Sequence, residues 1–159
     1  GQSNIIDLKC LEYRKSRFST YDLCNKYHFY IAGVQIFNRS QDLIEQLRDY
    51  SSSVNCARAH QLILDFFKPL VDDEFVAKLD QILLFLNGLV SCLKGKYISF
   101  EMSSLLLVFN QSTRDLKMKV IDLAYVEESF NQNSINSFKG MMEFLQKLKR
   151  RLTSTTQNE

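Results

Sequence analysis

Two acidic residues and one lysine stand where they could act on a phosphate group. Asp7 and Lys9 are two positions apart in an apolar stretch, so on a strand both would point to one face. Such a pair could orient a hydroxyl nucleophile and neutralise a phosphate, or it could be an ordinary surface ion pair. Asp122 follows an apolar run, where a buried carboxylate needs a partner. Mg²⁺ on nucleotide phosphates is one such partner, and simple exposure at a strand end is the alternative.

A basic segment lies between the first two apolar stretches. It shows no apolar period, which predicts a loop or a short helix. Its cations suit the recognition of a polyphosphate, although a solvated basic loop has the same composition. The cations are Arg14, Lys15, Arg17 and Lys26.

Length, charge and cysteine usage exclude several classes of protein. The 159 residues suit one domain, and 20 Lys+Arg against 18 Asp+Glu create no strong field that would demand nucleic acid or a membrane. The longest apolar run, 82–93, is interrupted and shorter than a membrane span. Four cysteines without metal-ligand spacing indicate reduced thiols, and residues 1–9 lack the apolar core of a signal peptide. We therefore expect an intracellular protein, cytoplasmic or nuclear, without a nucleic-acid or membrane partner.

The apolar periods predict an α+β fold, a small antiparallel sheet packed with about four helices. Alternating or β-branched stretches predict strands over 5–13, 27–37, 97–109 and 116–123, and Gly33 suggests a bulge. Spacings of three and four predict helices over 41–50, 56–68, 73–94 and 134–152, with Ser40 capping the first and Gly95 ending the third. The domain spans 1–152, and 153–159 form a polar tail.

The order of these pieces resembles the C-terminal part of the inositol polyphosphate kinase family. That family has a D-x-K strand, an aromatic strand ending in Q-V-Y, an S-S-L-L strand, an I-D-F turn and a final helix with G-L-x-x-L. The corresponding stretches are Asp7–Lys9, Tyr27–Asn38, Ser103–Leu106, Ile121–Ala124 and Ser137–Leu145. The resemblance covers about residues 5–152 and implies the fold of that lobe.

The resemblance also implies roles for the side chains. Asp7 would contact the nucleotide ribose or help to form the catalytic centre, and Lys9 would bind the inositol phosphate and the phosphoryl group in transfer. Asp122 would hold Mg²⁺ on the ATP phosphates, beside Ser103 or Ser104. The basic segment, from Arg14 to Lys26, would occupy the inositol-binding region.

The sequence departs from the family at several positions. The family proline and glycine around D-x-K are Ser3 and Leu11 here, and the aromatic residue of I-D-F is Leu123. The family's N-terminal lobe has no counterpart upstream of Asp7, so a missing lobe or a partner chain could complete the site. Three interpretations remain: an ATP- and Mg²⁺-dependent transferase with weak or no turnover as an isolated chain, a non-catalytic pseudokinase or interaction module, and an unrelated α+β domain.

Overall fold

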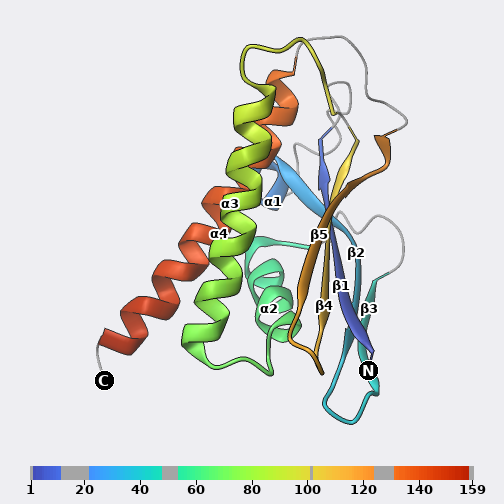
Figure 1. Cartoon of the computed structure of the whole chain (residues 1–159), viewed down its shortest axis with the longest axis vertical. Coiled ribbons are helices and arrows are strands. Elements are labelled where there is room, and N and C mark those ends of the chain that lie inside the picture. The colour runs from blue at the N-terminus through green and yellow to red at the C-terminus, as the bar shows by residue number, and fades with distance from the viewer. Residues whose placement is uncertain (1, 12–21, 48–53, 101, 124–130, 158–159) are drawn as a thin grey trace.

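The computed structural model describes residues 2–11, 22–47, 54–100, 102–123 and 131–157. These residues form five strands and four helices (Figure 1). In chain order they are β1 (Ser3–Cys10), α1 (Asp22–Tyr27), β2 (Phe29–Phe37), β3 (Leu43–Leu47), α2 (Cys56–Phe66), α3 (Asp72–Leu93), β4 (Ser104–Asn110), β5 (Leu116–Ile121) and α4 (Gln132–Gln157). The expected α+β class is confirmed.

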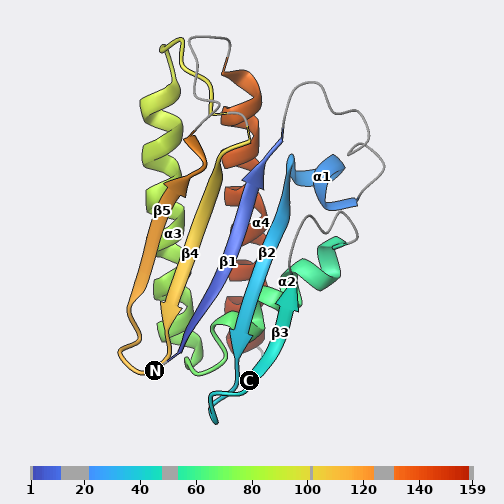
Figure 2. The ribbon, with the colours of Figure 1, turned by 90° about the vertical axis from the view of Figure 1, so that its right-hand side faces the viewer.

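The five strands form one antiparallel sheet in the order β3-β2-β1-β4-β5. Helices α2, α3 and α4 lie against one face of the sheet. The other face carries no described helix and faces the viewer in Figure 2. Burial along β1 alternates, with Ile6, Leu8 and Cys10 turned to the helices and Asp7 and Lys9 turned to the open face. The strand therefore delivers both charged side chains to the uncovered side of the sheet.

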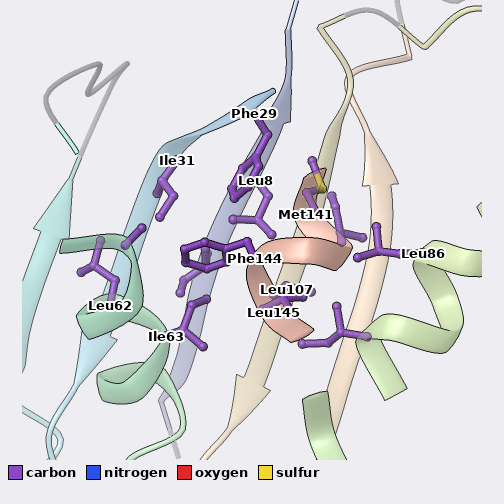
Figure 3. Packing of buried hydrophobic residues seen from close by; sticks show 14 of the residues in the cluster. Leu8, Phe29, Ile31, Leu62, Ile63, Leu86, Leu107, Met141, Phe144 and Leu145 are labelled. Carbon is purple, nitrogen blue, oxygen red and sulfur yellow. The ribbon is translucent and has the colours of Figure 1, made fainter. Parts of the chain in front are cut away.

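Helix α4 lies along the sheet and forms the centre of the core (Figure 3). Phe144 is fully buried, and its ring meets Tyr27 and Phe29 edge to face with ring centres 5.5 Å apart. Leu86 of α3 and Phe138 of α4 are also fully buried, as the apolar stripes predict. Burial of each such side chain contributes roughly 1.5–3 kcal/mol to stability. Packing in this core fixes the position of the sheet relative to α3 and α4.

The helix predicted over residues 41–50 is wrong, because residues 43–47 form strand β3. The turn before it is closed by Asn38, whose backbone N–H donates to the Asp42 carbonyl and whose side-chain oxygen accepts from the Asp42 N–H. Gln41 adopts a positive φ of 66° in this turn. Ser40 is thus a hairpin residue and caps no helix. Pairing of β3 with β2 supplies the backbone hydrogen bonds that a helix would have made.

Other boundaries shift in ways that the local backbone explains. The strand predicted from residue 97 begins only at Ser104, because Met102 has a positive φ of 61° and breaks the extended run. Helix α4 continues to Gln157, into residues assigned from sequence to a polar tail. The bulge at Gly33 is confirmed by a register shift opposite Asp7 and Leu8. Gly95 does end α3, with a φ of 74°.

Helix α3 is the one described helix that is long and apolar enough to cross a membrane by length and composition alone. Its inner stripe nevertheless packs into the protein core, as that of a core helix does. The four cysteines are unpaired; Cys10 and Cys24 are buried, Cys56 is half-buried and Cys92 is exposed.

Candidate functional site

The candidate site lies where β1 and β5 end and β4 begins, at the upper end of the sheet in Figure 2. Antiparallel pairing places Lys9 opposite Ser104, and Ser104 opposite Ile121, the residue before Asp122. Directly opposed residues of neighbouring strands point to the same face. Residues separated by more than a hundred positions in the chain thus meet on the open face.

Lys9 and Asp122 form an ion pair across this end of the sheet. The Lys9 Nζ lies 3.4 Å from the Asp122 Oδ2. The lysine side chain is 18% exposed and the aspartate side chain 54% exposed. A pair with so much water around the carboxylate is worth little to stability, so its partners can be exchanged for a ligand at small cost.

Asp7 is the more deeply placed acid. Burial raises the pKa of its carboxyl group, while Ser104 and the Lys9 ammonium favour the charged form and the nearby Asp122 charge opposes it. Its Oδ1 and the Ser104 Oγ are both buried, and the Ser104 side chain forms a hydrogen bond with the carboxyl group that favours its charged form. Buried polar atoms are almost always satisfied in folded proteins. The buried Asp7 and Ser104 side chains therefore act on each other, while the Asp122 carboxylate above them stays accessible.

The two serines have different positions, which the sequence left open. The carbonyl of Ser103 accepts from the Cys10 N–H at 2.9 Å, and its hydroxyl donates to the Asp122 carbonyl at 3.5 Å. Ser103 is completely buried and supports the backbone on which Asp122 sits. Ser104 is the serine that shares the open face with Asp7 and Lys9.

Two unusual backbone conformations flank the site. Asp122 and Met102 have positive φ values of 60° and 61°. The left-handed region is uncommon for residues other than glycine and costs on the order of 1–3 kcal/mol, and such residues cluster at functional sites. At Asp122 this conformation turns the chain immediately after β5, where the carboxylate meets Lys9.

Gly33 is a feature of the site that the sequence marked only as a bulge. It pairs with Asp7 on the β2 side. Because it has no side chain, the open face beside the Asp7 carboxylate is not filled from β2. A glycine inside an apolar strand was the available signal, since it often marks the close approach of a ligand.

Lys26 lies in a different charged environment from Lys9. It is exposed on α1, and together with Lys147 and Arg151 of α4 it acts electrostatically on His60 of α2. It is not among the charges that act on Asp7. Sequence reasoning missed this second group of cations, because only the packing of α1, α2 and α4 brings its members together. Arg14, Lys15 and Arg17 lie outside the described residues.

The residues at the strand ends suit a hard divalent cation. Asp7, Asp122 and Ser104 offer oxygen atoms, which are the ligands that Mg²⁺ and Mn²⁺ prefer. The described residues contain no group of three or more His, Cys, Asp or Glu side chains that could enclose a metal. Such a sparse set fits an ion that takes its remaining ligands from water and phosphate.

Comparison with known proteins identifies the fold and the family. The chain has the fold of the inositol phosphate multikinase Ipk2 from S. cerevisiae, solved with ADP and Mn²⁺: the TM-score is 0.72 at 18% identity, over 92% of this chain and 78% of that one. No curated protein matches the chain significantly. The family model described as inositol polyphosphate kinase matches residues 11–156, a segment that begins just after Asp7 and Lys9. The chain thus belongs to the inositol polyphosphate kinase family.

Proposed function

We propose that this chain binds ATP with a divalent cation, and an inositol phosphate, at the open end of the sheet, and that it transfers a phosphoryl group between them. The observation that carries the proposal is the convergence of Asp7, Lys9, Ser104 and Asp122 from three strands at one end of the sheet. Family membership supports the inositol phosphate as the acceptor.

Each side chain has a role that its surroundings support. The Lys9 ammonium, freed from Asp122 when a ligand enters, would neutralise phosphate charge. The half-exposed Asp122 carboxylate would hold the cation, with Asp7 and Ser104 as further oxygen donors beneath it. A bound divalent cation supplies charge stabilisation to the phosphoryl group in transfer. Because phosphoryl transfer needs little covalent help, positioning and charge account for most of what these residues could contribute.

A second function is favoured by the departures from the family pattern. Leu11 and Leu123 replace the expected glycine and aromatic residue beside the site. A protein that retains the charged residues and loses the shape around them would bind an inositol phosphate without turnover. This non-catalytic module is the alternative that the experiment must separate.

The experiment incubates the full chain with labelled ATP, Mg²⁺ or Mn²⁺, and a panel of inositol phosphates, and measures binding and product formation separately. Lys9→Ala and Asp122→Asn are the test variants. Lys117→Ala and Asp115→Asn make the same changes at exposed positions toward the other end of β5. Product that is lost in the test variants and kept in the controls supports the kinase. Binding without product supports the module, and no binding of either ligand contradicts both.

A further inference from the structure

The outward face of helix α3 carries small and polar residues around one exposed leucine. At spacings of three and four, these residues form one exposed stripe on the side away from the core: Ala77, Gln81, Leu84, Gly88 and Ser91. Leu84, at the centre, is 75% exposed. A Cβ atom added at Gly88 would meet nothing within 4 Å. Figure 2 shows α3 standing at the side of the molecule, behind β5, and Figure 1 shows it in front of α4.

Leu84 is the one large apolar side chain of α3 that is exposed, and its two chain neighbours are also apolar. Helix α3 contains a window with a mean hydropathy of 1.5, and only 28% of that window is buried. Leu83 and Phe85, on either side of Leu84, are half-buried and therefore border the stripe with further apolar surface. Residues of small volume at Ala77 and Gly88 would let a second helix approach closely.

The charges at the two ends of α3 are opposite in sign. The helix begins with Asp72, Asp73 and Glu74, and is followed by Lys94 and Lys96. Within the described residues, Glu74 pairs with Arg114, but Asp72, Asp73, Lys94 and Lys96 form no ion pair. The acidic and basic ends are separated by the length of the 22-residue helix, about 33 Å at 1.5 Å per residue.

We propose that this face binds the same face of a second copy of the chain, with the two α3 helices antiparallel and a twofold axis at Leu84. Leu84 would then meet its own counterpart. Ala77 and Ser91 are equally far from Leu84, so each would face the other across the axis. The same symmetry places Asp73 of one copy beside Lys94 of the other, at both ends.

The charge pattern selects this arrangement over the alternative. A parallel pairing would place acidic ends together and basic ends together, which is repulsive. A twofold interface repeats each favourable contact twice, which suits a surface that is complementary to itself. One helix pair lies at the small end of interfaces, below about 1,200 Å², so the dimer should be weak and salt-sensitive.

Cysteine cross-linking under a mild oxidant tests the geometry, with Cys92→Ser as the background because Cys92 is exposed. A disulfide needs Cα atoms about 4.4–6.8 Å apart, which only a residue on the axis can offer to its own copy. Leu84→Cys should therefore cross-link with itself. Ala77→Cys and Ser91→Cys should cross-link only when mixed, because each lies roughly 20 Å from its own copy along antiparallel helices.

Sedimentation of the unmodified chain at rising concentration gives an independent reading. The mean mass should rise toward that of a dimer, and Leu84→Glu should keep the chain monomeric with an unchanged circular dichroism spectrum. The proposal is overturned if the chain stays monomeric up to about 1 mM, a range in which weak contacts are populated. It is also overturned if Ala77→Cys alone cross-links as readily as Leu84→Cys, since that is random collision.

Discussion

At the scale of single residues, the charged Asp7 carboxylate suits cation binding but lowers the stability of the folded protein. It is half-buried on the open face, and burial raises its pKa more than Ser104 and Lys9 lower it. A group whose pKa is raised by folding binds its proton more tightly in the folded state. Its contribution to stability is therefore lost as pH rises from 3.8 through the raised pKa.

Replacing this carboxylate by a neutral isostere should stabilise the protein. We expect Asp7→Asn to raise the free energy of unfolding at pH 7 by about 1 kcal/mol, because a buried charge is removed. The same change should weaken cation-dependent nucleotide binding. Urea unfolding at pH 5 and pH 7 checks the first effect, and the gain should shrink toward the lower pH. Asp115→Asn, at an exposed position, is the control; a destabilised Asp7→Asn would contradict the interpretation.

His60 gives the opposite pH dependence. Its ring stacks on Phe144 with centres 4.4 Å apart, and burial, followed by Arg151, Lys147 and Lys26, lowers its pKa. The unfolded chain therefore binds the proton more readily. Stability is complete above the unfolded pKa of about 6.5 and falls as pH drops below it.

The direction of this pH dependence of stability can be measured, with a second histidine as the reference. We expect the free energy of unfolding to fall between pH 7.5 and pH 5.5, and we expect His60→Gln to flatten that slope. His28 is exposed with a φ of 59°, a conformation that asparagine tolerates. His28→Asn is the matched control for the loss of one exposed histidine. Equal slopes in the unmodified protein and His60→Gln would show that His60 is not the group responsible.

At the scale of the elements, a close approach of α1 to α4 depends on one glycine. A Cβ atom at position 140 would collide with the backbone carbonyl of Tyr27, the last residue of α1. A backbone atom cannot move aside as a flexible side chain can. The contact also sets the position of Tyr27, whose ring packs on Phe144.

Gly140→Ala should thus destabilise the protein although alanine is the better helix former. We expect a loss of roughly 2–4 kcal/mol in the free energy of unfolding, because α1 must move away from α4. Gly88→Ala in α3 is the matched control, since a Cβ there meets nothing within 4 Å. At a dilution where the chain is monomeric, it should stabilise the chain by up to about 1 kcal/mol, through helix propensity alone. Similar effects from the two substitutions would contradict the close packing.

At the scale of the whole molecule, function is expected from a local concentration of charge and not from net charge. The chain as a whole carries only +2 at pH 7. One face of the sheet is covered by helices and the other presents its charged residues at one end (Figure 2). Binding of a polyphosphate there should depend on screening, because the cations are partly exposed.

The affinity for an inositol polyphosphate should fall about tenfold or more between 50 mM and 500 mM salt, as the Debye length shortens from roughly 14 Å to 4 Å. Lys9→Ala should lower the affinity at low salt and make the salt dependence shallower. Titration calorimetry over a series of salt concentrations measures both. Lys117→Ala, at an exposed position of β5, should change neither. An affinity that does not respond to salt would mean that shape, and not charge, dominates recognition.

Local patterns in the sequence were enough to predict most of the elements. The apolar stripes of α3 and α4, the alternation along β1, and the glycines at 33 and 95 each depend on periodicity or backbone freedom within a few residues. The order of D-x-K, S-S-L-L and I-D also indicated the family. These features are encoded locally, so they can be interpreted without knowing what lies across the sheet.

Tertiary structure decided the remaining features. Leu43 and Leu47 have helical spacing, yet pairing with β2 makes their segment a strand. Asn4 is fully buried, and its side chain donates to the Phe66 carbonyl and accepts from the Phe37 N–H. No local sequence pattern connects it to those two elements. Strand register likewise sets the 3.4 Å approach of Lys9 to Asp122, and burial sets the pKa of Asp7. Contact, burial and pKa depend on which distant segments meet, and only the folded chain brings those segments together.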